Sequence, residues 1–400
     1  MDAKLLPMLA RHAAATLQSL AHHYPVLALT GPRQSGKTTL ARAAFPGKPY
    51  TSLEDLDTRE FAERDPRGFL AQYPDGAVFD EAQRCPSLFS YLQTRVDTDC
   101  RMGLYLLTGS QQFGLLAGIS QSLAGRSGLV HLLPFSLDEV SAAKPPRDLE
   151  TLLWQGLYPP VIDREPPPQT WLRDYVATYI ERDVRQMINV RDLSAFRRFL
   201  RMCAARCAQA LNLAGLAADC GITHNTARAW ISVLEASYIV FLLPPHHRNF
   251  GKRLVKTPKL YFYDSGLAAA LAGVQSPHEL ALGSMRGALF ETWVVGEFLK
   301  RRCHFGLAPE LYYWRDSNGR EVDLLVDHGS EQRPLEAKAG ATIARDWFDS
   351  IVRFIDWSNA GQGALIYAGS QAQRRGAVNV YGWRDIGVAT QSLFAPKNRT

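Results

Sequence analysis

The chain has 400 residues, of which 46% are hydrophobic, and this is enough apolar material for two to four domains that each have a core. Its formal net charge of +6 and its isoelectric point of about 9.0 permit binding to nucleic acid but do not establish it. Its longest apolar runs, such as residues 238–243, fall far short of the roughly 20 residues that span a bilayer, and residues 1–18 lack a secretory pattern, so we expect a soluble, cytoplasmic protein with no membrane partner.

Three breaks in composition divide the chain into four predicted domains. Two of them are rich in proline, at residues 144–146 and 165–168, and the third is the stretch 273–277. Prolines stop helices and disfavour a helical conformation in the residue before them. The predicted domains are 1–145, 146–205, 206–275 and 280–400.

Three short apolar strands are predicted in the first domain, at residues 26–30, 77–80 and 104–108. Their apolar residues are continuous rather than alternating, which is typical of a parallel sheet that is buried on both faces. Helical stretches separate the strands, so the sequence predicts an α/β fold with a doubly wound sheet.

A phosphate-binding motif follows the first strand. Residues 31–38 read GPRQSGKT and fit the G-x-x-x-x-G-K-[ST] pattern between a strand and a helix, which is the context that the motif requires. In such a loop the backbone N–H groups surround phosphate, the lysine reaches the β- and γ-phosphates, and the next hydroxyl binds magnesium. The predicted cofactors are ATP and Mg²⁺, and the predicted nucleotide-binding residues are Gly31, Gln34, Ser35, Gly36, Lys37, Thr38 and Thr39, with Thr38 also on the metal.

Polar residues end the next two strands. Asp80 is predicted to hold magnesium and Glu81 to polarise the attacking water as general base, although such a pair can also cap a helix. Ser110, with Gln111 as second candidate, is predicted to orient the water, and the alternative is a simple turn.

Three segments together resemble a known family: residues 31–39, VFDEAQRCPSL, and LLTGSQQFGLL followed by SLAGRSGLVHLLPFSLDE. They look like the prokaryotic AAA-type P-loop ATPases that carry a C-terminal domain of unknown function (DUF4143-like). The resemblance implies a homo-oligomer, such as a hexameric ring, in which Arg126 reaches the γ-phosphate of a neighbouring subunit. The alternative is a structural arginine that pairs with Glu139 or another acid. Arg182 and Arg185 are weaker candidates for a sensor.

Residues 211–262 are predicted to form a winged helix-turn-helix. A helix at 213–219, a turn at 220–222, a second helix and two strands at 238–243 and 259–263 follow one another, and the stretch 244–256 contains no acid. Such a second helix can enter a major groove, and a basic wing can contact phosphates. The predicted DNA contacts are His224, Asn225 and Arg228 on the helix, and Arg248, Lys252, Arg253 and Lys256 on the wing.

Two alternatives to DNA contact are open for the middle segment. Winged helices often bind other proteins, and a basic hairpin is often only a solvated surface feature. A further basic helix carries Arg197, Arg198, Arg201 and Arg206, for which both readings are open. The order of an ATPase core, a helical segment and a winged helix is similar to that of DNA-engaging AAA+ motors, including the Holliday-junction branch-migration motor, in architecture only.

The last domain resembles the PD-(D/E)XK nuclease core, an α/β restriction-endonuclease-like fold. A helix at 286–301, a hairpin and a strand at 334–338 carry the residue types of that signature: Glu291, Asp323, Glu336 and Lys338. The resemblance implies that Asp323 and Glu336 bind Mg²⁺ and that the lysine positions water. The alternatives are a retained binding platform and an ion pair with Lys338 that stabilises the sheet.

Three functions are therefore open. The favoured one is an ATP-hydrolysing protein that engages branched or duplex DNA, as a motor with a nuclease-like domain. The second is an ATP-dependent switch that binds a protein partner, and the third is an autonomous magnesium-dependent nuclease.

Overall fold

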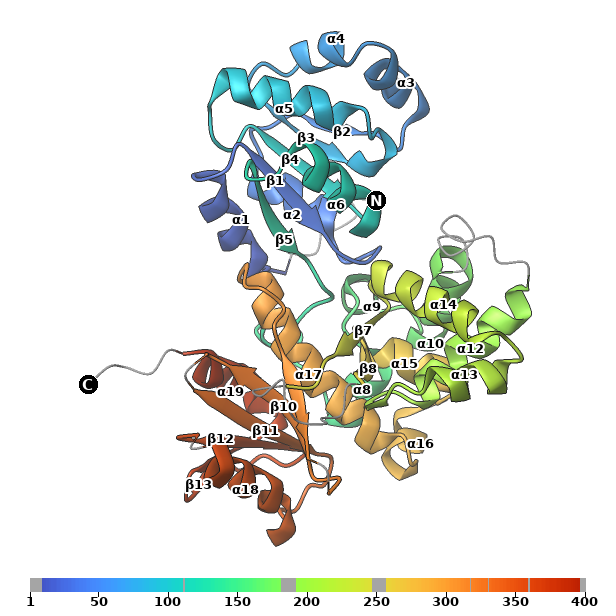
Figure 1. The fold of residues 1–400 in the computed structure, drawn as a ribbon, viewed down its shortest axis with the longest axis vertical. Coiled ribbons are helices and arrows are strands. Elements are labelled where there is room, and N and C mark those ends of the chain that lie inside the picture. Colours follow the sequence, from blue (N-terminus) through green and yellow to red (C-terminus); the bar gives the residue numbers. More distant parts are fainter. Residues whose placement is uncertain are drawn as a thin grey trace, which may run out of the picture. The chain divides into compact units, whose positions relative to one another are not determined.

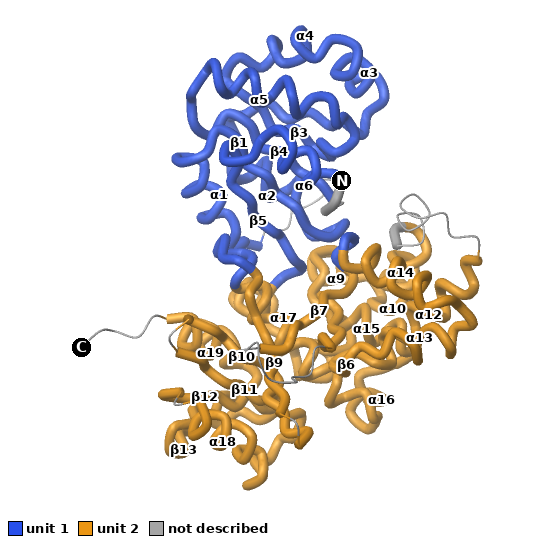
Figure 2. Tube along the Cα trace, in the orientation of Figure 1, with its two compact units in different colours: residues 1–135, 236–238, 302–308 blue, residues 136–235, 239–301, 309–400 orange. Residues whose placement is uncertain are grey.

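The computed structural model describes residues 9–110, 112–180, 192–246, 257–316, 318–329, 331–358 and 360–395. The chain forms two compact units (Figure 2). Unit 1 contains residues 1–135, 236–238 and 302–308, and unit 2 contains residues 136–235, 239–301 and 309–400. In the described part of the chain, none of the helices is both long enough and apolar enough to cross a membrane.

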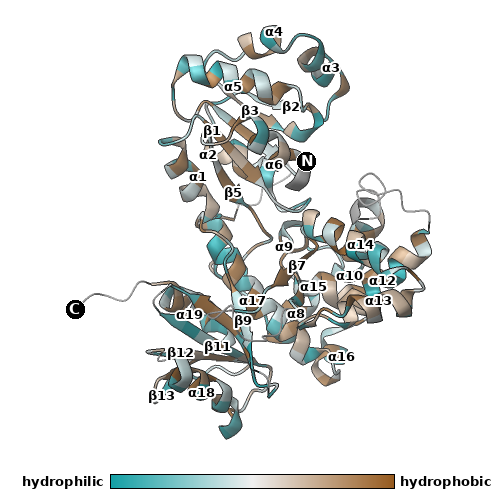
Figure 3. Ribbon diagram, in the orientation of Figure 1, coloured by the Kyte–Doolittle hydropathy of each residue, from teal (hydrophilic) through white to brown (hydrophobic). Residues whose placement is uncertain are grey.

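A five-stranded parallel sheet forms the centre of unit 1, with the order β2-β3-β4-β1-β5 (Figure 1). The strands are β1 (Val26–Thr30), β2 (Tyr50–Ser52), β3 (Ala77–Asp80), β4 (Tyr105–Gly109) and β5 (Ser127–His131). The predicted parallel sheet is confirmed, and β2 and β5 were not among the predicted strands. Figure 3 shows the hydrophobic colouring of β1, β3 and β4 in the middle of the sheet.

Helices cover both faces of this sheet. One apolar core joins the strands to α1 (Ala13–Ala21) and α2 (Lys37–Ala44) and includes Leu27 and Leu29 of β1. The other core includes Val26 and Ala28 and joins the strands to α3 (Leu56–Arg64), α4 (Pro66–Ala71), α5 (Leu88–Asp99) and α6 (Gln112–Ser122). Successive side chains of β1 thus point to opposite faces and all are buried, which explains the continuous apolar run. A short 3₁₀ helix, η1 (Ala82–Arg84), follows β3.

Unit 2 begins with a helical segment. Its elements are α7 (Leu137–Ser141), α8 (Leu149–Gln155), α9 (Pro159–Asp163), α10 (Pro168–Tyr175), the π-helical turn η2 (Val176–Ile180), α12 (Leu193–Ala205), α13 (Leu213–Cys220), α14 (His224–Ala236), α15 (Ser265–Ala272) and α16 (Pro277–Leu282). Between them lies a small antiparallel sheet of order β6-β8-β7, made of β6 (Gln209–Ala210), β7 (Val240–Leu243) and β8 (Lys259–Phe262).

The helix-turn-helix expected here is present as α13, a turn at Gly221 and α14. Gly221 ends α13 in the left-handed region at φ 66°, and the Thr223 hydroxyl accepts the Thr226 N–H at the start of α14. Trp230 of α14 packs edge-on against Phe196 and Phe199 of α12. The strand predicted at 238–243 begins only at Val240, because Tyr238 has a φ of 56° and cannot continue a strand.

The C-terminal part of unit 2 is a six-stranded sheet beside the long helix α17 (Arg286–His304). The strand order is β13-β14-β12-β11-β10-β9, with β9 (Tyr312–Arg315), β10 (Glu321–Asp327), β11 (Gln332–Lys338), β12 (Gly363–Tyr367), β13 (Gln373–Arg375) and β14 (Val378–Gly382). Strands β9, β10 and β11 are antiparallel, whereas β11, β12 and β14 are parallel. The remaining helices are η3 (Arg345–Phe348), α18 (Asp349–Ser358), η4 (Trp383–Asp385) and α19 (Ile386–Phe394).

Candidate functional site

The loop between β1 and α2 has the backbone of a phosphate-binding loop. Gly31 has a φ of 150°, and a Cβ there would lie 2.1 Å from the carbonyl oxygen of Leu132, so only glycine fits. Gln34 and Gly36 have φ values of 64° and 90°. Gly36 is also the N-cap of α2 and has no side chain to cap the helix, so the first backbone N–H groups of α2 are open to an anion.

The side chains of this loop fit a nucleotide and magnesium. The Lys37 ammonium lies inside the loop and donates to the carbonyl oxygens of Gly31 at 3.0 Å and Pro32 at 2.8 Å. The Thr38 hydroxyl donates to the Asp80 carboxylate at 2.9 Å, which joins the two residues predicted for the metal. The Ser35 hydroxyl is fully buried and has no hydrogen-bond partner among the described residues, as expected of a group that awaits a phosphate oxygen.

Asp80 accepts hydrogen bonds from three hydroxyl groups, of which the sequence predicted one. Besides Thr38, the donors are Tyr50 on β2, at 2.7 Å, and Thr108 on β4. Burial, followed by the hydrogen bond to Asp80, raises the pKa of Tyr50, so Tyr50 stays protonated and is a permanent donor. Tyr50 lies in none of the motifs named above, and Thr108 lies in one but was given no role. The strand order β2-β3-β4 brings both beside Asp80.

Glu81 occupies a constrained position directly after β3. Its φ of 55° is unusual for a residue other than glycine, and its backbone N–H donates to Thr108. Its carboxylate accepts hydrogen bonds from Ser110 at 3.0 Å and from Gln83 at 2.5 Å. The structure therefore brings the predicted water-orienting residue into contact with the predicted base. Glu81 precedes η1 but its side chain does not cap it, and Gln111 lies outside the described residues.

Arg126 lies at the amino ends of the strands, whereas the phosphate loop lies at their carboxyl ends. It immediately precedes β5, and its carbonyl accepts the N–H of Val26 at the start of β1, whereas the phosphate loop follows the end of β1. Its guanidinium is bidentate to Asp97, with distances of 2.5 and 2.8 Å. The acid that pairs with Arg126 is thus Asp97 rather than Glu139, which belongs to a capping box with Ser136. Arg182 and Arg185 lie outside the described residues.

Three buried polar residues beneath the phosphate loop contact one another and were not predicted from the sequence. Thr30, the last residue of β1, receives a hydrogen bond from the Tyr238 hydroxyl at 2.7 Å and lies 2.7 Å from Nδ1 of His131. Burial lowers the pKa of His131 to about 4, so the ring is neutral and its Nδ1 can accept a hydrogen bond. Since 208 residues separate Thr30 from Tyr238, no local pattern could have found this contact.

Arg11 is a second missed residue and supports the loop from outside. Its guanidinium donates to the carbonyl oxygens of Ser35 at 2.8 Å and Leu133 at 2.6 Å, and it lies over the Phe135 ring. The phosphate loop is therefore held in place by Arg11, which precedes α1, and by the backbone of the segment after β5, as well as by its own glycines.

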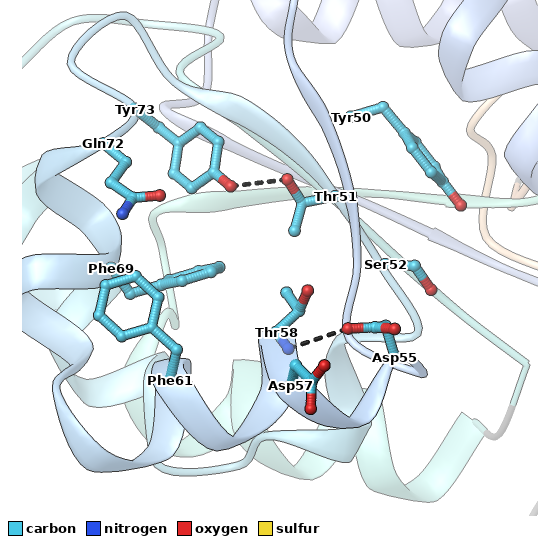
Figure 4. Close-up of a pocket in the computed structure, with 10 residues that line it drawn as sticks. All are labelled: Tyr50, Thr51, Ser52, Asp55, Asp57, Thr58, Phe61, Phe69, Gln72 and Tyr73. Atoms are coloured by element: carbon cyan, nitrogen blue, oxygen red, sulfur yellow. Dashed lines mark hydrogen bonds between the residues drawn. The ribbon is translucent and has the colours of Figure 1, made fainter.

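A cavity of about 470 Å³ lies beside β2, and its lining residues include neither the phosphate loop nor Asp80 and Glu81 (Figure 4). The polar groups that line it are partly paired with one another, as in the hydrogen bonds from Tyr73 to Thr51 and from the Thr58 N–H to Asp55. Of its lining residues, Tyr50 is the one that also bonds to Asp80. We assign the chemistry to the phosphate loop rather than to this cavity.

The predicted DNA-contacting residues of the second helix lie at the start of α14. His224, Asn225 and Arg228 are exposed, whereas Ala227 and Trp230 on the opposite side of the helix are buried. Arg197, Arg198 and Arg201 lie on the exposed side of α12, and Arg206 pairs with Asp219. The predicted wing residues Arg248, Lys252, Arg253 and Lys256 lie outside the described residues.

The four nuclease-like residues converge within unit 2. Glu291 comes from α17, Asp323 from β10, and Glu336 and Lys338 from the neighbouring strand β11. Lys338 pairs with Glu336 and lies 3.8 Å from Asp323, and Asp323 accepts the N–H of Ala337 at 3.0 Å. Burial, and then the charge of Asp323, raises the pKa of Glu336 to about 9.

Three further residues complete this cluster and were not predicted. The ammonium of Lys259, on β8, lies 2.6 Å from Glu291 and 2.5 Å from Glu321. The Tyr261 hydroxyl donates to Glu291 at 2.6 Å. Burial by itself would lower the pKa of Lys259, but Tyr261 and the surrounding carboxylates raise it well above its ordinary value, so Lys259 is a cation.

Comparison with protein families divides the chain into three matched regions. Residues 23–141 match an AAA domain, residues 146–278 match a domain of unknown function (DUF8612), and residues 286–386 match a domain of unknown function (DUF4143). Among solved structures, the chain is similar to the Walker-type ATPase PABY2304 of Pyrococcus abyssi, with 16% identity over 66% of this chain and 96% of that chain and a TM-score of 0.44. It is also similar to the RuvB Holliday junction branch migration motor of Thermotoga maritima, with 19% identity over 59% of this chain and 90% of that chain and a TM-score of 0.29.

Two full-length relatives extend this assignment. The uncharacterized proteins Rv2008c of Mycobacterium tuberculosis and Mb2031c of Mycobacterium bovis are each 33% identical to this chain over 351 residues, which cover 86% of this chain and 77% of each relative. The predicted α/β AAA-type fold and the predicted C-terminal domain are thereby confirmed. The chain belongs to the same family as these two mycobacterial proteins, and it is an AAA-type P-loop ATPase with a DUF4143 domain after the ATPase domain.

Proposed function

We propose that this ATPase couples ATP hydrolysis to the engagement of branched or duplex DNA. The observation that carries the proposal is the position of Tyr238. Its hydroxyl bonds to Thr30, the residue before the phosphate loop, and it lies two residues beyond the end of α14, the helix predicted to contact DNA. A change in the loop on nucleotide binding therefore has a short route to α14, through one hydrogen bond and two residues of backbone.

The hydrolysis chemistry is assigned to residues that the structure brings together. Lys37 and the open N–H groups of α2 bind the phosphates, while Thr38 and Asp80 hold magnesium, which when bound neutralises charge on the phosphate oxygens. Glu81 accepts a proton from water, and Ser110 keeps the Glu81 carboxylate in position through their hydrogen bond.

The DNA-binding proposal rests on the exposed start of α14. A helix that presents His224, Asn225 and Arg228 to solvent, after a glycine turn and before strands of a small antiparallel sheet, supports the predicted winged helix. The net charge of +6 favours a polyanion as partner. We also propose an assembly of several copies of the chain, as the family resemblance implies. In it Arg126, which lies along the sheet from its own phosphate loop, would act on the nucleotide site of a neighbour.

We infer a restriction-endonuclease-like fold for the DUF4143 domain. Its support is the order of a long helix, an antiparallel hairpin and a parallel continuation, with Glu291, Asp323 and Glu336 side by side. In the proposed function this domain is a second surface for nucleic acid.

The experiment is a steady-state magnesium-ATPase assay with no DNA and with single-stranded, duplex and four-way-junction DNA. Glu81→Gln is the blank, because it removes the base but leaves the binding loop intact. We expect stimulation by at least one DNA form, and a loss of that stimulation at higher salt as counterions compete for the phosphates. Hydrolysis that no DNA form changes would contradict the proposal and would favour the ATP-dependent switch with a protein partner.

A further inference from the structure

The carboxylate cluster of the DUF4143 domain already contains a cation from its own chain. The Lys259 ammonium lies 2.6 Å from Glu291, 2.5 Å from Glu321 and 3.8 Å from Asp323. These three carboxylates come from α17 and β10, so the ammonium lies at the point where the two elements face each other.

We propose that Lys259 serves as the built-in cation of this cluster and excludes a divalent metal from it. In a metal-dependent nuclease the acids from the helix and the hairpin converge on magnesium. Here the Lys259 ammonium lies between the Glu291 and Asp323 carboxylates, where such an ion would be bound.

Simple displacement of Lys259 by a metal ion is unfavourable. The residue is 3% exposed, and its strand β8 is paired on both sides, with β6 and with β7. The ammonium also lies 5.9 Å and 5.8 Å from the ring centroids of Tyr261 and Tyr313. A metal would have to enter beside a fixed positive charge in a buried site, where charge repulsion is weakly screened.

On the side of the cluster away from Lys259, one carboxylate oxygen lacks a hydrogen-bond partner among the described residues. Glu336 is 2% exposed, one of its oxygens pairs with Lys338, and the other has no hydrogen-bond partner among the described residues. The geometry therefore holds one group that could still accept a ligand, and the loss of Lys259 would leave buried acids whose charge a divalent cation or further protons would neutralise.

The inference does not depend on DNA coupling of the ATPase. It concerns metal binding by the full chain without nucleotide or DNA, so its failure and that of the proposed function are distinguishable. The consequence for chemistry is that the wild-type cluster does not act as a metal-dependent nuclease while Lys259 is in place.

The test is a calorimetric titration of the nucleotide-free protein with Mn²⁺, in which only binding that disappears in Asp323→Asn is counted. We expect no such binding in the wild type. Lys259→Met is expected to gain one Mn²⁺ per chain, and the double variant Lys259→Met/Asp323→Asn is expected to lose it. The matched control is Lys300→Met, which removes another buried ammonium, 2.8 Å from Glu297, and is expected to gain nothing.

Two results would overturn the proposal. One is Asp323-dependent binding of Mn²⁺, or Asp323-dependent cleavage of plasmid DNA, by the wild type. The other is a Lys259→Met protein that has native circular dichroism but gains no site. If Lys259→Met does not fold, Asp323-dependent binding of Mn²⁺ by the wild type remains the result that would overturn the proposal.

Discussion

At the scale of single residues, hydroxyl groups hold the acids of the hydrolysis site in place. Thr38, Tyr50 and Thr108 all donate to Asp80, and Ser110 donates to Glu81. A carboxylate with several fixed donors keeps one orientation. Thr38 and Asp80 are the residues that would hold magnesium, and Tyr50 and Thr108 would orient Asp80 through their own hydrogen bonds.

Tyr50→Phe is therefore expected to weaken magnesium use rather than nucleotide binding. The loss of one hydrogen bond to a charged group is worth about 1.5 kcal/mol, so we expect kcat to fall about tenfold. The magnesium concentration for half-maximal rate should rise as well. Titrations of ATPase rate with Mg²⁺ at fixed ATP measure both changes.

Tyr73→Phe is the matched control for this substitution. Its hydroxyl pairs with Thr51 in the cavity that Tyr50 also lines, but it does not touch Asp80 (Figure 4). An equal effect of both substitutions on magnesium dependence would show that Tyr50 acts only through the packing of β2.

The stability of unit 1 is expected to depend on pH through His131. Its pKa is about 4 in the folded protein, below the ordinary value of 6.5, so folding favours the neutral ring. The stabilisation is present above pH 6.5 and is lost as the pH falls through 6.5 towards 4, and it amounts to about 3 kcal/mol. Calorimetric scans between pH 7.5 and 4.5 measure it, with the transition of unit 1 identified by its shift on addition of ATP.

His131→Gln should flatten this pH dependence, since glutamine does not titrate. His22→Gln removes an exposed histidine of the same unit and should leave the dependence unchanged. Parallel curves for the wild type and His131→Gln would contradict the assignment.

At the scale of elements, the ends of the strands decide where the chemistry lies. The phosphate loop follows β1, Asp80 is the last residue of β3, and Ser110 follows β4, and parallel pairing places these carboxyl ends of the strands together. The segment Ala236–Tyr238 reaches the same part of unit 1 from the end of α14, and the positive φ of Tyr238 turns the chain before β7 begins.

Tyr238→Phe is expected to uncouple hydrolysis from DNA, provided that DNA stimulates the wild type. The substitution keeps the ring but removes the hydroxyl that donates to Thr30 and lies 2.9 Å from Nδ1 of His131. The ratio of the DNA-stimulated rate to the unstimulated rate should fall towards one. Parallel assays with Tyr73→Phe, which loses a hydroxyl elsewhere in unit 1, show whether any buried tyrosine has this effect.

The elements that carry local signals could be predicted from the sequence. The phosphate loop, the Asp80-Glu81 pair at the end of β3 and the segment around Gly221 have residue types at fixed spacing, and the structure has the expected strands and helices at these places. Tyr50, Tyr238 and Lys259 could not be predicted, because each acts through a contact between segments distant in the chain. Lys259 in particular contacts Glu291 of α17 from strand β8 of the three-stranded sheet. It lies outside residues 291–338, in which the motif was found.

At the scale of the whole molecule, Arg126 distinguishes a monomeric ATPase from an assembled one. It lies at the amino end of β5, and the phosphate loop lies beyond the carboxyl end of β1, with which β5 is parallel. The length of the sheet therefore separates Arg126 from the nucleotide site of its own unit. A role of Arg126 in hydrolysis requires a second copy of the chain.

We expect two inactive variants to restore activity when mixed. Glu81→Gln keeps Arg126 but lacks the base, and Arg126→Ala keeps the base but lacks the arginine. In a mixed assembly some intact sites receive Arg126 from a Glu81→Gln neighbour, so the ATPase rate of the mixture should exceed the sum of the separate rates. Arg101→Ala, which removes another exposed arginine paired with an aspartate, should by itself retain activity. If Arg126→Ala is fully active, or if the mixture shows only the sum of the separate rates, Arg126 has no role in hydrolysis and serves only in its ion pair with Asp97.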